Sequence, residues 1–190
     1  MRRIAFLFAG TLLLAACTAG PSASLQDRLQ NPLFAEYYYD DLVDQMVTLQ
    51  LHNDPAVVED AGKDLADATR RDALQQSRDA QGLQQQGRMG EFVEAEAYAK
   101  GEVLLTDDAL YFHPTFLATP GVDIRVMLTE SIDPRDVEFP DPSAQDLGGL
   151  KSPYGDQWYA LSAPQDSMRT VVLWDAGLKR LMSFAQLRTH

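Results

Sequence analysis

The sequence predicts an α+β fold in which an N-terminal helical hairpin is followed by an antiparallel β-sandwich. Apolar residues recur at helical spacing from Pro32 to about Gly87, and this spacing changes to two after Gly90. Turn-forming Asp, Gly and Pro residues then separate six or seven short segments within about 95 residues, which is typical of a sandwich or barrel. With 190 residues and 45% hydrophobic content, the chain can bury a core.

The first predicted helix begins at Pro32, and Asn53-Asp54-Pro55 predicts the cap and first position of the second. In the first helix the apolar stripe comprises Phe34, Tyr38, Leu42, Met46 and Leu49, with Val43 and Val47 beside it. The expected buried stripe of the second helix is Val58, Ala61, Leu65 and Ala68. Few apolar residues follow Leu74, so the end of this helix is expected to fray.

The second half of the chain alternates between apolar and polar residues. The predicted strands cover about 97–106, 109–113, 122–129, 157–162, 170–174 and 179–185. In 122–129 the side chains of Val122, Ile124, Val126 and Leu128 are expected to share one face. We place the hairpin at 32–90 and the β domain at 91–190, with a flexible join at Gly87 to Gly90 and a further break at Gly148-Gly149.

The first sixteen residues have the pattern of an export signal. Arg2 and Arg3 precede an apolar run from Ile4 to Ala16, which is shorter than the roughly twenty residues that a membrane-spanning helix needs. The signal peptide is therefore predicted to cover residues 1–16.

The apolar run ends in Leu14-Ala15-Ala16-Cys17, which resembles the lipobox of bacterial lipoproteins. That resemblance implies cleavage before Cys17 and acylation of its sulfur, with palmitate as an acyl chain. An ordinary secretory signal is the alternative, but it leaves the single cysteine unexplained. Residues 17–31 are then expected to form a lipid-anchored tether, flexible as far as Asp27.

The expected location is the bacterial cell envelope, lipid-anchored at the outer membrane and facing the periplasm or the cell surface. The outer-membrane assignment rests on Thr18, because an aspartate after the cysteine resembles an inner-membrane retention signal. Removing the signal lowers the basic residues from 16 to 14 against 28 acidic ones, a net charge of −14. Such a polyanion excludes a nucleic-acid role, so the expected partners are the membrane, through lipidated Cys17, and a protein of the envelope.

A series of short sequence motifs in the β half resembles the electron-transfer DM-thirteen domain family over roughly residues 92 to 188. The motifs are Gly101-Glu102-Val103, Pro120 to Leu128, Asp146 to Lys151, Gly155 to Tyr159, Val171-Val172-Leu173-Trp174 and Ala185-Gln186-Leu187, in the order of the family. The resemblance implies a small β-sandwich. It also implies a redox role, which in the family is attributed to a cysteine directly after the tryptophan.

In this chain the family's redox position is Asp175, and an aspartate cannot cycle between thiol and disulfide. Asp175-Ala176-Gly177 instead favours a turn, because Asp accepts local backbone hydrogen bonds and Gly permits a positive φ. We interpret Asp175 as the end of a strand in preference to a catalytic or metal-binding carboxylate. On this interpretation, Asp175→Asn should be folded and nearly as stable.

No other arrangement of residues predicts catalysis or a cofactor. The histidines are His52, His113 and His190. None lies in a recognisable hydrolase motif, and their spacing is not that of zinc ligands. The acidic loop from Asp133 to Asp146 offers weak calcium candidates in Asp133, Asp136 and Asp141, but it lacks EF-hand spacing and a solvated loop is favoured.

Two classes of function remain open from the sequence. The first is a non-enzymatic envelope lipoprotein whose β-sandwich acts as a binding or structural module. The alternative is an electron-transfer accessory that uses a bound cofactor or a redox partner protein. The missing cysteine at Asp175 favours the first class.

Overall fold

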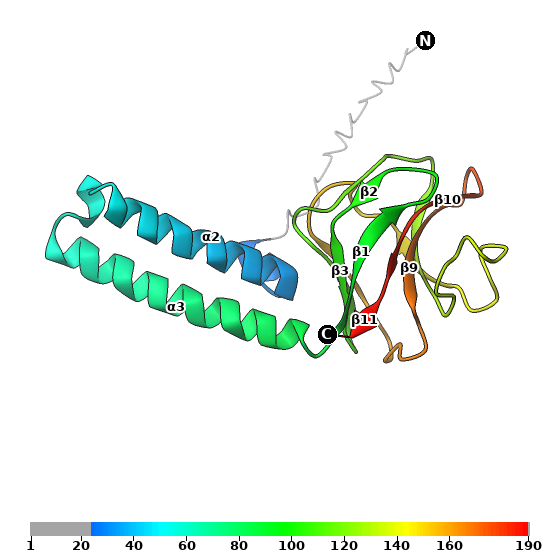
Figure 1. Cartoon of the computed structure of the whole chain (residues 1–190), viewed down its shortest axis with the longest axis horizontal. Coiled ribbons are helices and arrows are strands. Elements are labelled where there is room, and N and C mark those ends of the chain that lie inside the picture. The colour runs from blue at the N-terminus through cyan, green and yellow to red at the C-terminus, as the bar shows by residue number, and fades with distance from the viewer. Residues whose placement is uncertain (1–23, 190) are drawn as a thin grey trace, which may run out of the picture.

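The computed structural model describes residues 24–189, in which a helical part is followed by a β part (Figure 1). The helical elements are α1 (Leu25–Arg28), α2 (Pro32–Leu51), the 3-10 helix η1 (Pro55–Val57) and α3 (Asp60–Gln84). The strands are β1 (Arg88–Glu94), β2 (Ala99–Lys100), β3 (Glu102–Leu105), β4 (Ala109–Phe112), β5 (Leu117–Ala118), β6 (Ile124–Thr129), β7 (Gln145–Gly149), β8 (Gln157–Ala160), β9 (Thr170–Asp175), β10 (Arg180–Gln186) and β11 (Arg188–Thr189). The predicted α+β class, with a hairpin before an antiparallel sheet, is confirmed.

The hairpin begins where the sequence predicts, but its second helix starts later. Asn31 caps α2 through a hydrogen bond from Leu33 N to its Oδ1 (3.0 Å). Asp54 and Pro55 begin η1 in place of a long helix, because the side chain of Asp54 caps that short turn through Ala56 N (2.9 Å). Helix α3 begins at Asp60 and continues to Gln84 without the expected fraying after Leu74.

The predicted buried stripe of α3 is wrong. Val58 and Leu65 are 54% and 69% exposed. The buried residues of α3 are small or polar: Ala66, Ala73, Ser77, Ala80 and Gln84. Alanines seven residues apart lie on one face and let two helices approach closely. Polar groups complete this interface, since Ser77 Oγ donates to Asp40 (2.6 Å) and Gln84 Nε2 to Glu36 (2.6 Å).

The main sheet has nine strands and nearly closes on itself. Its order is β7-β6-β9-β10-β1-β3-β4-β8 with β11 paired to β1, while β2 and β5 form a separate pair. The two edge strands meet through side chains: Tyr159 of β8 donates to the carbonyl of Gly149 in β7 (3.0 Å), and Gln157 accepts from Lys151 N (3.0 Å). Burial raises the pKa of Tyr159 to about 12. The result is a barrel-like sandwich around a main apolar core, with a second, smaller apolar cluster of Met127, Val172, Leu181 and Phe184.

Four strands were missed from the sequence, namely β1, β5, β7 and β11, and β1 is central in the sheet. The expected linker at Gly87 to Gly90 is wrong, because β1 already begins at Arg88 and pairs with β3, β10 and β11. The expected break at Gly148-Gly149 lies inside β7. The predicted face of β6 is correct for Val126 and Leu128, which are fully buried, whereas Val122 precedes the strand and is 73% exposed.

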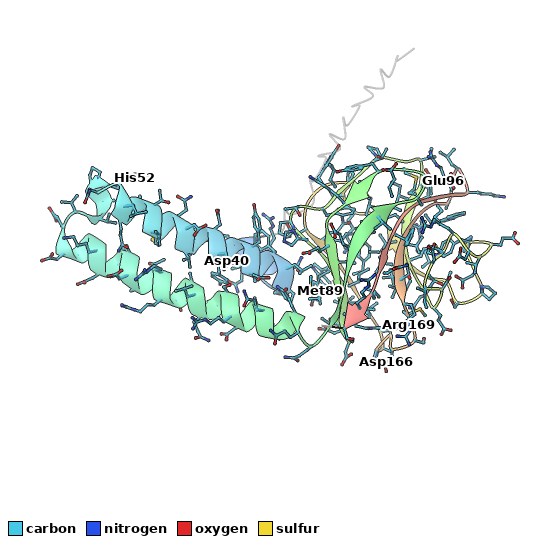
Figure 2. The ribbon with its side chains drawn as sticks, in the orientation of Figure 1. Asp40, His52, Met89, Glu96, Asp166 and Arg169 are labelled. Carbon is cyan, nitrogen blue, oxygen red and sulfur yellow. The ribbon has the colours of Figure 1, made fainter. Side chains whose placement is uncertain are left out.

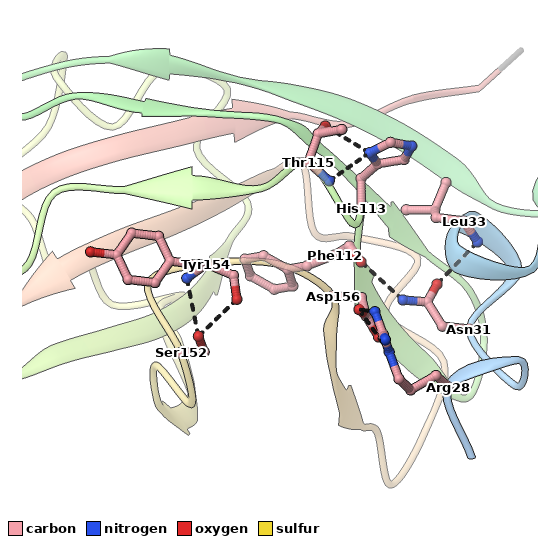
Figure 3. A network of polar contacts seen from close by, with 9 residues as sticks. All are labelled: Arg28, Asn31, Leu33, Phe112, His113, Thr115, Ser152, Tyr154 and Asp156. Carbon is pink, nitrogen blue, oxygen red and sulfur yellow. Dashed lines mark hydrogen bonds and ion pairs between the residues drawn. The ribbon is translucent and has the colours of Figure 1, made fainter. Parts of the chain in front are cut away.

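The described end of the predicted tether is docked on the β part (Figure 3). Arg28 Nε donates to both carboxylate oxygens of Asp156 (3.1 Å each), and the Arg28 guanidinium lies 3.9 Å from the Phe34 ring centroid. Asn31, only 1% exposed, donates from Nδ2 to the carbonyl of Phe112 (2.9 Å). A buried amide must make hydrogen bonds. Asn31 therefore fixes the base of the hairpin to β4, and residues 24–31 are not a free tether.

Gly90 lies where β1 changes partners, so we predict that Gly90→Ala destabilises the protein. A Cβ there would lie 2.7 Å from the carbonyl oxygen of Gln186, which is backbone and cannot move away alone. Overpacking of this kind costs about 1–3 kcal/mol. Denaturant titration of the free energy of unfolding would measure the loss.

Gly82→Ala is the matched control, because nothing lies within 4 Å of a Cβ at this position in α3. It should raise stability by roughly 0.5–1 kcal/mol through helix propensity. Equal effects at Gly82 and Gly90 would contradict the proposed crowding.

Candidate functional site

The candidates from the sequence fall in different parts of the chain. Cys17, with the predicted signal and lipobox, lies outside the described residues. Asp175 ends β9, and Asp133, Asp136 and Asp141 lie in the loop between β6 and β7. The structure does not bring these carboxylates together.

Asp175 is fully buried and holds two separate segments through its carboxylate. Its Oδ2 accepts from Val122 N (2.8 Å), and its Oδ1 accepts from Asp123 N (3.3 Å) and Leu178 N (3.0 Å). The bond from Leu178 closes the predicted turn after β9. The bonds from Val122 and Asp123 fix the loop before β6, which sequence reasoning did not predict.

The surroundings of Asp175 leave no access for a substrate. Burial alone would raise its pKa, but the backbone N–H groups of Val122, Leu178 and Asp123 together outweigh it, so the pKa is lowered. A Cβ at Gly121 would lie 2.5 Å from Oδ2, so the loop backbone covers the carboxylate closely. Asp175 is therefore an ionised structural residue.

Two of the three candidate carboxylates in the loop between β6 and β7, Asp133 and Asp141, are likewise held by hydrogen-bond donors. Asp133 pairs with the Arg135 guanidinium (2.5 Å), and this hydrogen bond lowers the pKa of Asp133. Burial opposes ionisation of Asp141, but hydrogen bonds from Ser143 and Thr129 outweigh it and lower its pKa. Within residues 24–189 no three His, Cys, Asp or Glu side chains are placed to hold a metal.

The two described histidines serve local structure. His52 is the C-terminal cap residue of α2. His113 Nδ1 accepts from Thr115 N (3.1 Å; Figure 3). The His113 ring also meets Tyr37 edge to face. Burial lowers the pKa of His113 despite the nearby Glu102 and Glu36. The Nδ1 atom is engaged by a backbone N–H, so it is not positioned to act as a general base.

A hollow lies over β1, whose first residues the sequence predicts to be a linker. It has a volume of about 590 Å³, and Met89, Glu91, Val93, Glu102, Arg135 and Phe184 contribute to its lining. Arg135 reaches across from the loop, with its guanidinium 5.0 Å from the Phe184 ring centroid. The hollow is shallow and carries charges of both signs, so its lining does not define a ligand class.

Comparison with known proteins found no match to a family model, a curated protein or a solved structure. The resemblance to the electron-transfer DM-thirteen domain therefore stays a prediction. No helix within residues 24–189 is long and apolar enough to cross a membrane.

The structure revises the expectation that Asp175→Asn is nearly as stable as the wild type. Asparagine keeps one acceptor oxygen and replaces the other carboxylate oxygen with an NH₂ group. That NH₂ group cannot accept a hydrogen bond from the backbone N–H that faces it. We predict that Asp175→Asn is clearly less stable near pH 7, as measured by urea titration. A wild-type-like midpoint would contradict the role of both carboxylate oxygens.

The stability that Asp175→Asn loses should be largest near neutral pH and smaller in acid. The folded-state pKa of Asp175 lies below its usual value of 3.8, so its contribution is present above about pH 4 and is lost as pH falls through the folded pKa. The difference in unfolding free energy between wild type and Asp175→Asn should therefore decrease as pH falls below about 4. Asp123→Asn is the control, because Asp123 contributes only backbone groups to this cluster.

Proposed function

We propose that this chain is a non-enzymatic bacterial cell-envelope lipoprotein whose β-sandwich acts as a binding or structural module. The observation that carries the proposal is Leu14-Ala15-Ala16-Cys17 at the end of a short apolar run behind two arginines. Lipid on Cys17 would account for the single cysteine and would supply membrane attachment to a chain whose net charge repels anionic head groups. We place the protein at the outer membrane, facing the periplasm or the cell surface.

The geometry around Asp175 supports a redox-silent module. Its carboxylate accepts from three backbone N–H groups and is fully buried, so the position at which the family has its cysteine is structural here. His113, Asp133 and Asp141 are likewise engaged by local hydrogen bonds. Binding through surfaces is the activity that remains, with an envelope protein as the proposed partner.

Lipidation is tested by Cys17→Ser in a bacterial host. The wild type should incorporate labelled palmitate, lose residues 1–16 and sediment with the membranes. Without a sulfur to acylate, Cys17→Ser should incorporate no label and should remain unprocessed or be released. Mass spectrometry showing an unmodified Cys17, or cleavage at another bond, would overturn the assignment. Thr18→Asp tests sorting separately, since it should move the lipoprotein to the inner membrane.

Absence of redox chemistry is tested on protein isolated from its native envelope. We expect no visible absorption band, and no titratable thiol once Cys17 is acylated. A haem-like or flavin-like band that is bleached or shifted by a reductant would favour an electron-transfer accessory, because a bound cofactor would then carry the electron.

A further inference from the structure

The docked start of the described chain decides which face of the protein lies nearest to Cys17. Arg28 of α1 pairs with Asp156, just before β8, so α1 is held on the β part and not at the far end of the hairpin. Ser24, which caps α1, follows Cys17 by seven residues. Whatever their conformation, these residues span at most about 25 Å. The surface around α1 is therefore the one that an anchor at Cys17 would keep nearest to a bilayer.

Large apolar and aromatic side chains are exposed around the pair of Arg28 and Asp156. Leu25 is 47% exposed and lies one helical turn before Arg28, on the same face of α1. Tyr154 and Trp158 are 60% and 43% exposed. Each is two residues from Asp156, so their Cα atoms lie within about 7 Å of its Cα (Tyr154 is drawn with this pair in Figure 3). We call Leu25, Tyr154 and Trp158 the α1 patch.

Trp158 lies on the outer face of β8 with a cation beside it. Its neighbours Gln157 and Tyr159 are buried on the inner face, and Tyr111 of β4 lies opposite Trp158 in the sheet. Lys151 Nζ donates to the carbonyl of Trp158 (2.5 Å) and lies 5.3 Å from the centroid of its ring. Trp and Lys side chains both join an apolar body to a polar end, so this edge of the patch is amphipathic.

The charges around the α1 patch cancel, in contrast to those of the whole chain. Residues 24–31 and 150–160 contain two cations, Arg28 and Lys151, and two carboxylates, Asp27 and Asp156. Asp27 is directed to the start of α1, where its carboxylate accepts from Ser24 N (3.0 Å). The whole chain has a net charge of −12 and is repelled by anionic lipid. A surface without net charge can approach a zwitterionic bilayer without that repulsion.

We propose that the α1 patch, with Lys151 at its edge, contacts the interface of a zwitterionic bilayer when the chain is anchored there through Cys17. The inference deepens the proposed function and rests on it, because the anchor at Cys17 is what holds this face near a membrane.

Position and composition favour a bilayer over a second copy or another protein as the occupant. The patch surrounds the point at which the described chain begins, within reach of the proposed anchor. Trp and Tyr are enriched at membrane–water interfaces, where their rings lie at the level of the head groups, and Lys can extend its ammonium group toward the phosphates. A weak contact suffices, since a short tether raises the effective concentration to about millimolar.

The test couples the mature chain, residues 17–190, to phosphatidylcholine vesicles through a maleimide-bearing lipid. Cys17 is the single cysteine, so coupling is specific, and it does not depend on whether a bacterial host acylates this residue. Trp174→Phe leaves Trp158 as the single tryptophan. On coupling, its emission should shift to shorter wavelength, and brominated phosphatidylcholine should quench it. If Trp174→Phe perturbs the fold, the chain with both tryptophans gives the same comparison over a constant background.

Leu25→Gln with Tyr154→Ser should lower the equilibrium constant for this contact at least about tenfold, because it removes apolar area from the patch. Both side chains are exposed, and the hydrogen bonds of Tyr154 to Ser152 use its backbone, so the variant should keep its far-ultraviolet circular dichroism.

Leu51→Gln is the matched control. Leu51 is 74% exposed and lies beside His52 near the far end of the hairpin (Figure 2), about 30 Å from the start of α2, so quenching of Trp158 should be unchanged. Trp158→Phe is the second control. It keeps Trp174, which packs on Phe139 in the fifth strand from β8 in the sheet order and should not be quenched.

An anchored chain whose Trp158 is not quenched would overturn the proposed contact, and so would quenching that Leu25→Gln with Tyr154→Ser leaves intact. Neither result would affect the lipoprotein assignment. A bacterial host that leaves Cys17 unmodified would overturn the proposed function instead, so the two failures are distinguishable.

Discussion

The hydrogen bonding of β1 is the constraint on which the rest of the structure depends. This strand lies in the middle of the sheet order and pairs with β3 on one edge, and with β11 and then β10 on the other. The change of partner takes place at Gly90, where the carbonyl of Gln186 approaches too closely for a side chain. Because only residues 85–87 separate α3 from β1, the same strand also fixes where the hairpin leaves the sheet. Asn31 then holds the other end of the hairpin to β4.

The elements that the sequence predicted well are those whose signals are local. Asn31 and Pro32 supply a cap and a first helical residue, so the start of α2 follows from two adjacent positions. β6 alternates between apolar and polar residues along part of its length, and β9 is a run of apolar residues, because their side chains pack in the core. By contrast, β1 opens on Arg88-Met89-Gly90, which reads as a linker, since its core contact rests mainly on Phe92. β7 is an edge strand with no fully buried residue, so it has no periodic signal.

The interface between α2 and α3 shows a different limit of periodicity. The pattern assigned Leu65 and Val58 to the buried side, yet the helices pack through alanines and through hydrogen bonds between polar side chains. Alanine and polar side chains stand out little in a hydropathy pattern, so that pattern did not identify the buried face of α3. At Asp175 the turn to Leu178 could be predicted from Asp-Ala-Gly, whereas its bonds to Val122 and Asp123 join segments more than fifty residues apart. Gly121, which leaves room for the carboxylate, was the available signal.

The two parts of the molecule therefore differ in how their side chains are used. In the β part, the carboxylates that might have done chemistry already accept hydrogen bonds: Asp175 from backbone N–H groups, Asp133 from Arg135, and Asp141 from Thr129 and Ser143. A carboxylate held in this way is ionised but has few acceptor sites left for a metal or a substrate. In the helical part, hydrogen bonds between polar side chains join α2 to α3 beside the buried alanines of α3, while Leu65 and Leu83 stay exposed. The β part therefore uses its carboxylates to hold loops in place, and the helical part uses its polar side chains to join two helices.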